Sequence, residues 1–317
     1  MELDGYSFRR YALEDWEQIN ELYFDEYGHD YPYPLHDHRS DLTALSTVAE
    51  KSGNIVGFAR ATPFEGHNDV YEFGGLIVAK PNRHRKIAHE LTYSRMRAVL
   101  LRNPAIIMSE PVCYRADCAS QHNLLKYGFA CFGIRPFKYP SLQLHLLGEQ
   151  AETVSLSIRH LNLSHGFEER PIFIPQEYVP FLKAVRLSIG KDKSAGVFSQ
   201  QAMPPPIHNA AITAHGRTGS EFVHIPLNWE ESLDTINEYR QKGYLFSGVL
   251  PDYGTLANGF HFDYLTLYRP PQHHGFDFDL INVLQDMKRL KSLMAHEYAA
   301  TVHKRSDIQL SSECFGS

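Results

Sequence analysis

The chain has 317 residues, of which 43% are hydrophobic and 21% charged, a composition typical of a folded globular protein with a sizeable core. Its formal net charge of -6 does not favour nucleic acid as a partner, and its four cysteines are too few for a disulfide framework. No run reaches the roughly 18 apolar residues that span a bilayer and the N-terminus lacks the apolar core of a signal peptide, so we expect a cytoplasmic protein with no membrane span.

The first half of the chain carries the apolar patterns of a mixed sheet with helices. KSGN, at 51–54, has the glycine and asparagine expected of a tight hairpin turn, which predicts an antiparallel start to the sheet. In chain order, the predicted elements are a strand at 6–10, a helix at 13–27, strands at 45–49, 55–62 and 70–78, a helix from 87 to about 101, a strand at 106–113, a helix at 120–129 and a strand at 130–137.

The second half alternates strands and helices in the same way. The predicted elements are a strand at 153–161, a helix at 176–188, strands at 210–215 and 221–225, a helix at 230–242, strands at 244–250 and 260–268, and an amphipathic helix from 279 to about 303 with a loose end after it. The patterns predict an α+β fold with a mixed sheet, divided into a first domain at 1–145, a second unit at 146–275, and a C-terminal helix and tail at 276–317.

A strand that enters a helix through a basic turn is the central feature of the first domain. The turn runs from Arg83 to Ala88 and includes Arg85 and Lys86. The first turn of a helix presents unpaired backbone N–H groups and the positive end of the helix dipole, so this place is suited to a phosphate group. A solvated basic loop is the alternative, although basic residues at a helix start oppose the dipole and therefore need a reason.

The segment LIVAKPNRHRKIAHEL, at 76–91, resembles the central motif of GNAT acyltransferases, in which a strand and a proline precede Arg or Gln, two residues, Gly, one residue, and Gly or Ala. Arg83 and Ala88 fit this pattern, whereas Lys86 replaces the first glycine, so we expect no positive φ there. The resemblance implies that acetyl-CoA or a longer acyl-CoA is the cosubstrate. It implies that the donor is bound by Ile77, Val78, Ala79, Arg83, His84, Arg85, Lys86, Ile87, Ala88 and Ser120.

The segment SQHNLLKYGF, at 120–129, resembles the later GNAT motif, in which a helix beside the pantetheine arm runs into a Gly-Phe pair. The resemblance covers residues 6 to about 140. The segment EYRQKGYLFSGVLP, at 238–251, resembles the same ending, but no second basic turn accompanies it. We therefore expect a GNAT fold followed by a partial, GNAT-like second unit that completes the sheet or shapes the acceptor cleft.

Direct acyl transfer needs a neutral amine, a backbone N–H that polarises the thioester carbonyl, and a proton for the leaving thiolate. By resemblance, the N–H comes from Ile77 to Ala79. Glu72, on the strand that enters the motif, is the first candidate for the general base, and Glu110, at the end of the neighbouring strand, is the second. An ordinary carboxylate in solvent is the alternative for each.

The general acid is less obvious from the residues. The family commonly has a tyrosine four residues before the Gly of the Gly-Phe pair, and this chain has Leu124 there. Tyr127 points elsewhere around the helix, whereas Tyr114 and Cys118 lie upstream near the expected thiol end and are candidate substitutes. A CoA thiolate also leaves with little acid assistance.

Two other kinds of site deserve comparison with acyl transfer. Histidines cluster in polar loops at a spacing that matches no closed zinc pattern, so we expect no metal; they are His29, His36, His38, His273 and His274. Cys118 and His122 are four residues apart and suggest a thiol nucleophile, but a buried, inert cysteine is the commoner case.

The sequence therefore predicts an N-acyltransferase that moves an acetyl or longer acyl group to a primary amine. The donor is acyl-CoA or an acyl carrier protein, and the acceptor is a small molecule or a peptide. The rival hypothesis is a noncatalytic module that binds acyl-CoA or regulates another protein.

Overall fold

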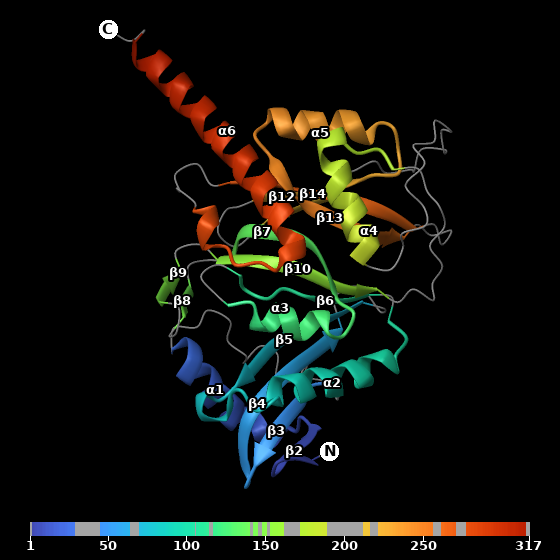
Figure 1. Cartoon of the computed structure of the whole chain (residues 1–317), viewed down its shortest axis with the longest axis vertical. Helices are drawn as coiled ribbons and strands as arrows, with labels where there is room; N and C mark the ends of the chain where they lie inside the picture. Colours follow the sequence, from blue (N-terminus) through green and yellow to red (C-terminus); the bar gives the residue numbers. More distant parts are fainter. Residues whose placement is uncertain are drawn as a thin grey trace. The chain divides into compact units, whose positions relative to one another are not determined.

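A computed structural model of the chain (Figure 1) describes residues 2–28, 45–63, 70–104, 106–113, 117–139, 142–144, 148–150, 153–161, 172–188, 212–215, 221–255, 261–270 and 277–314. The chain divides into two compact units. Unit 1 is Met1–Cys131 with Pro140–Gly166, and unit 2 is Phe132–Tyr139 with Phe167–Ser317. The segment at 132–139 thus groups with the later part of the chain, although in sequence it directly follows the first segment of unit 1.

Unit 1 is a mixed sheet in which the order of strands is β1-β2-β3-β4-β5-β6-β10. All neighbours are antiparallel except β5 and β6, which run parallel. Its elements are β1 (Glu2–Leu3), β2 (Tyr6–Arg10), η1 (Leu13–Asp15), α1 (Trp16–Tyr27), β3 (Thr47–Lys51), β4 (Asn54–Pro63), β5 (Val70–Val78), η3 (Lys80–Asn82), α2 (Ile87–Leu100), β6 (Ile106–Ser109), α3 (Ala119–Leu125), β8 (Leu142–Leu144), β9 (Gly148–Gln150) and β10 (Thr153–Leu161).

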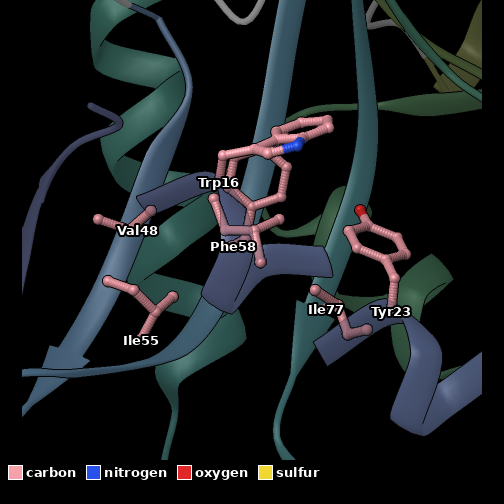
Figure 2. Close-up of a cluster of buried hydrophobic side chains, with 7 residues drawn as sticks. Trp16, Tyr23, Val48, Ile55, Phe58 and Ile77 are labelled. Atoms are coloured by element: carbon pink, nitrogen blue, oxygen red, sulfur yellow. The ribbon is translucent and has the colours of Figure 1, made fainter. Parts of the chain in front are cut away.

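The helices α1 and α2 cover opposite faces of this sheet. Trp16, Ile19 and Tyr23 of α1 pack with Phe58 in one buried cluster, which Figure 2 shows. Ile87 and Leu91 of α2 pack with Ala59 in another. Because successive strand residues point to opposite faces, the neighbours Phe58 and Ala59 place the two helices on the two sides.

The hairpin between β3 and β4 forms as the sequence predicts. Lys51 pairs with Asn54, so the connection is a loop of two residues. Ser52 and Gly53 both have positive φ, 51° and 81°, as the twist of a tight hairpin requires.

The pairing of β5 with its two neighbours is irregular near its middle. The register between β4 and β5 shifts between Phe58 and Arg60, whose partners are Ile77 and Gly74, so on β5 the irregularity falls at Gly75 and Leu76. On the other edge, the last register pair with β6 is Phe73–Ser109, whereas β5 continues to Val78. Beyond Phe73, the edge of β5 that faces β6 therefore has no strand partner among the described residues.

Unit 2 is an antiparallel sheet with the strand order β7-β13-β14-β12-β11. In this sheet β14 lies between β12 and β13. Its elements are β7 (Ala130–Tyr139), η5 (Gln176–Tyr178), α4 (Val179–Ser188), β11 (Ile212–His215), β12 (Glu221–Pro226), α5 (Ser232–Gln241), β13 (Leu245–Thr255), β14 (His261–Arg269), η6 (Phe278–Leu280), η7 (Gln285–Met287) and α6 (Lys288–Cys314).

A buried polar connection links α6 to the start of β13. The carboxylate of Glu297 accepts a hydrogen bond from the hydroxyl of Tyr178 at 2.7 Å and another from the backbone N–H of Phe246 at 2.9 Å. The rings of Tyr178 and Phe246 are stacked with centroids 4.1 Å apart. Burial, followed by the charge of Glu297, raises the pKa of Tyr178. The hydroxyl therefore stays protonated and donates.

The tail differs from its prediction. The sequence predicts a helix from 279 to about 303 and a loose end, but α6 begins at Lys288, after two short 3-10 turns, and runs to Cys314. Apolar spacing alone cannot separate 3-10 turns from the start of an α-helix. In the part of the chain that the structure describes, no helix is long and apolar enough to cross a membrane.

Candidate donor-binding site

The last residues of β5 present their amides alternately to the two edges of the strand. The N–H of Ala79 donates to the carbonyl of Val56 on β4 at 2.9 Å, and Ile77 pairs with Phe58 on the same edge. Because N–H directions alternate along a strand, the N–H groups of Leu76 and Val78 face the opposite edge. That is the edge on which β6 has already stopped pairing. The sequence pointed to Ile77 through Ala79 and missed Leu76, whose direction depends on the register with β4.

Two side chains from the helices hold the irregular part of β5. The hydroxyl of Tyr23, on α1, donates to the carbonyl of Gly75 at 2.6 Å. Arg95, on α2, donates through Nη1 to the carbonyls of Gly74 and Arg60, at 3.1 and 3.0 Å. The guanidinium of Arg95 is fully buried, and its burial lowers its pKa to about 9, so it remains charged at neutral pH.

The turn after β5 has an unusual backbone. His84 and Lys86 both have φ of 63°, in the left-handed region, although neither is glycine. The expectation that Lys86 lacks a positive φ is therefore wrong: this residue adopts the conformation that the missing glycine would adopt. Left-handed backbone costs an ordinary residue roughly 1–2 kcal/mol, and the surrounding turn supplies that energy here.

The start of α2 leaves its first amides available. The first helical hydrogen bond runs from the N–H of Glu90 to the carbonyl of Lys86 at 3.1 Å, so the N–H groups of Ile87, Ala88 and His89 precede it. Lys86 and Arg85 beside them are exposed. The place thus combines free amides, the positive end of a helix dipole and exposed cations, which together suit a phosphate or pyrophosphate.

Arg83 has a different position from its basic neighbours. Its Nε donates to the carbonyl of Val78 at 3.0 Å, and its Nη2 forms an ion pair with Glu26 of α1 at 2.7 Å. The side chain therefore ties the turn to the end of β5 and to α1. Any direct contact of Arg83 with a phosphate stays a prediction.

The two candidate bases lie near the point where β5 and β6 separate. Glu72 is half-buried on β5, and its carboxylate lies 3.5 Å from Nη2 of Arg60 on β4. Glu110 directly follows Ser109, the last residue of β6, and is half-buried. Both carboxylates are thus within unit 1 and close to the separated edges. Tyr114 lies outside the described residues.

The helix α3 is connected to α2 by side-chain hydrogen bonds. Asn123 donates through Nδ2 to the hydroxyl of Thr92 at 2.8 Å and to the carbonyl of Ala88 at 3.3 Å. The sequence reasoning did not single out Asn123, because its partners lie more than 30 residues away in the chain. Ser120 is exposed on the same helix. Leu124 is buried, so its position is filled by packing.

Tyr127 contacts the first turn of α2. Its hydroxyl lies 2.9 Å from Nδ1 of His89 and donates to the carbonyl of that residue at 3.0 Å. Burial, with the nearby Glu90 and Tyr93, raises the pKa of Tyr127 to about 12. The tyrosine joins α3 to the first turn of α2 and keeps its proton.

Two observations concern the alternative sites, a thiol nucleophile at Cys118 and a metal site. Burial, with the neighbouring charge of Asp117, raises the pKa of the Cys118 thiol, which disfavours the reactive thiolate. Among the residues that the structure describes, no three His, Cys, Asp or Glu side chains gather as a metal site requires. The histidines at 29, 36, 38, 273 and 274 lie outside the described residues.

The solved structures that match this chain cover about half of it. The ribosomal-protein-alanine N-acetyltransferase from Brucella melitensis is 18% identical, with a TM-score of 0.39, and the match covers 49% of this chain and 99% of that one. The ribosomal-protein-S18-alanine N-acetyltransferase from Escherichia coli is 13% identical, with a TM-score of 0.40 and coverage of 49% and 93%. The structure of yncA from Salmonella typhimurium with its cofactor acetyl-CoA is 13% identical, with a TM-score of 0.40, and the match covers 49% of this chain and 93% of that one.

A comparison with curated proteins found no match. A family model does match: residues 13–100 fit the model described as the acetyltransferase (GNAT) family. The matched stretch contains α1, β3, β4, β5, the left-handed turn and α2, which are the elements that build the candidate site. A second GNAT-like unit stays a prediction. Residues 13–100 of this chain therefore match an acetyltransferase (GNAT) domain.

Proposed function

We propose that the protein transfers an acyl group from an acyl-CoA to a primary amine by direct attack. The observation that carries this proposal is the separation of β5 from β6 after Phe73–Ser109. The gap leaves two backbone N–H groups of β5, those of Leu76 and Val78, on the same edge and about 7 Å apart along the strand. A pantetheine arm has amide and thioester carbonyls that hydrogen-bond such a strand edge.

The two amides have different roles in this proposal. The N–H of Leu76 polarises the thioester carbonyl and stabilises the negative charge that develops on its oxygen during attack. The N–H of Val78 binds an amide carbonyl of the pantetheine arm. The pyrophosphate then lies at the start of α2, against the amides of residues 87–89 and the cations of Arg85 and Lys86.

The proton balance of the reaction needs one base. The neutral amine attacks the thioester carbon, the carbon–sulfur bond breaks, and the amine proton must leave as the amide forms. Glu72 lies four residues before Leu76 on β5, a span of at most about 13 Å along the strand, so it takes that proton through a chain of waters. The thiolate leaves as the anion or takes a proton from solvent.

The direct test is release of free CoA by the full chain in the presence of amines. Acetyl-CoA and octanoyl-CoA are each incubated with a panel of polyamines, amino sugars and peptides with a free N-terminus, and CoA is quantified by chromatography. We expect release that depends on enzyme and amine together, with an acylated amine of matching mass.

Two results would contradict the proposal in different ways. Saturable binding of both thioesters without product across the panel favours the noncatalytic module. If calorimetry detects no binding of either thioester, free CoA is not the donor, and the same panel should be repeated with an acyl carrier protein as the carrier.

A further inference from the structure

We infer that Tyr23 is a positioning residue that orients and strengthens the Leu76 N–H as the donor to the thioester carbonyl. This inference rests on the proposed function and adds to it a residue from α1, which the sequence motifs do not include. The hydroxyl of Tyr23 donates to the carbonyl of Gly75 at 2.6 Å. Figure 2 shows the ring of Tyr23 beside the sheet, within the buried cluster under α1.

The carbonyl of Gly75 and the N–H of Leu76 belong to one peptide group. In a trans peptide the two bonds point in opposite directions, so holding the carbonyl on one side directs the N–H to the other. A short hydrogen bond to the carbonyl also draws electron density toward oxygen and makes the N–H of the same group a better donor. Tyr23 therefore acts on the amide that faces the gap, without itself entering the gap.

Gly75 makes this contact possible. Its φ of 57° is left-handed, and a Cβ at this position would overlap the hydroxyl oxygen of Tyr23. Only glycine provides both the backbone conformation and the space for the phenol to reach the carbonyl. A glycine peptide is otherwise free to rotate, so it needs an external partner to hold one orientation.

A second side chain, from α2, holds the neighbouring part of β5. Arg95 donates from the α2 side to the carbonyls of Gly74 and Arg60, and its guanidinium stacks on Phe73 with 4.3 Å between its carbon and the ring centroid. Loss of the Tyr23 hydroxyl alone should therefore leave the path of β5 intact.

The test compares Tyr23→Phe with a matched control, Tyr178→Phe. Tyr178 also loses a buried hydroxyl with a 2.7 Å hydrogen bond, but it lies in unit 2 and contacts Glu297. Acetyl-CoA labelled with ¹³C at the thioester carbonyl is bound to each protein, and the carbonyl stretch is measured by difference infrared spectroscopy. Binding affinity is measured in parallel by calorimetry.

We expect wild type and Tyr178→Phe to shift the carbonyl stretch to lower frequency, relative to free acetyl-CoA. Tyr23→Phe should lose most of that shift while its dissociation constant for acetyl-CoA changes less than about threefold. With an amine acceptor, Tyr23→Phe should lower kcat by about tenfold and leave KM for acetyl-CoA nearly unchanged, because the loss is confined to the transition state.

An equal carbonyl shift in Tyr23→Phe and wild type would overturn the inference and leave the proposed function standing. Failure of wild type to bind either acetyl-CoA or octanoyl-CoA is a separate outcome, which would remove both the inference and the acyl-CoA donor of the proposed function. A parallel loss of affinity and carbonyl shift in Tyr23→Phe would also contradict the inference, since it would mean that the hydroxyl holds the binding site as a whole.

Discussion

Arg83 donates its Nε–H to the carbonyl oxygen of Val78 at 3.0 Å, and so closes the turn between β5 and α2 onto the end of the strand. The basic turn therefore contains two kinds of cation. Arg83 is half-buried and bonded within the protein, whereas Arg85 is exposed. A double substitution of both, which the sequence motif suggests, would mix a structural effect with a binding effect.

The first prediction separates these two arginines. Arg83→Ala breaks the bond to Val78 and the ion pair with Glu26, so it should lower the free energy of unfolding by about 1–3 kcal/mol. Arg85→Ala should leave unfolding unchanged and weaken CoA binding by about two- to fivefold, in line with an exposed ion contact. Urea unfolding measures the free energy of unfolding of each variant, and calorimetry at two salt concentrations measures its affinity for CoA. A loss of CoA affinity for Arg85→Ala that is insensitive to salt would contradict an electrostatic contact.

The second prediction concerns the strain at Lys86. Because its φ is 63°, Lys86→Gly should be more stable than Lys86→Ala by about 1 kcal/mol. Asn237, exposed and inside α5, is the control, where the alanine variant should be more stable than the glycine variant by about 0.5–1 kcal/mol. Denaturant unfolding of the four variants checks the order. The same preference for alanine at both positions would argue against a left-handed Lys86.

The third prediction tests the close approach of β7 and β13. Gly248 pairs with Gly133, and a Cβ on Gly248 would collide with the carbonyl oxygen of Phe132 and lie 2.5 Å from Cα of Gly133. Gly248→Ala should therefore cost more than about 3 kcal/mol or prevent folding, because the obstacles are backbone atoms. Gly53→Ala, with φ of 81° and no atom within 4 Å of its Cβ, should cost only about 1 kcal/mol. If thermal unfolding shows similar losses of stability for Gly248→Ala and Gly53→Ala, the close pairing of β7 with β13 is contradicted.

The fourth prediction distinguishes the two candidate bases. Glu72→Gln keeps the size of the side chain and removes the charge, so it should lower kcat by about 10²–10⁴-fold without changing acyl-CoA affinity. Glu110→Gln should lower kcat less than tenfold. Steady-state kinetics with the acceptor found in the amine panel measure kcat for the two variants. Equal rates for Glu72→Gln and wild type would remove Glu72 from the mechanism and leave Glu110 as the candidate.

The fifth prediction follows from the raised pKa of Cys118. Burial and the charge of Asp117 keep the thiol protonated, so alkylation by iodoacetamide at pH 7 should be slower than that of a free cysteine and should rise with pH as the thiolate forms. Mass spectrometry of wild type and Cys118→Ser isolates this residue. Cys118→Ser should also keep full activity. Fast alkylation that does not change between pH 6 and 8 would instead support a thiol nucleophile.

Local patterns in the sequence were sufficient for most elements of the fold. The predicted strands at 70–78 and 153–161 coincide with β5 and β10, because the apolar and alternating patterns of short strands are local signals. The predicted strand at 106–113 is shorter in the structure, where β6 ends at Ser109. That early end opens the gap beside β5, and it depends on tertiary pairing that periodicity does not encode.

The candidate site was predictable only in part, for a related reason. The basic turn and the helix start are local, and the sequence placed them at 83–88. The direction of the Leu76 amide depends on the register with β4, and the carbonyl of Gly75 accepts a hydrogen bond from Tyr23, 52 residues earlier in the chain. The left-handed Lys86 shows that the turn imposes its backbone even where the preferred glycine is missing.

The most direct test of the account is a titration of the ¹⁵N-labelled full chain with acetyl-CoA, followed by amide chemical shifts. The account predicts that the amides of Leu76 and Val78 shift strongly together with those of residues 87–89, whereas Ala79, bonded to Val56, shifts much less. Saturation of the protein with acetyl-CoA that leaves Leu76, Val78 and the start of α2 unchanged would contradict it, because the donor would then bind elsewhere.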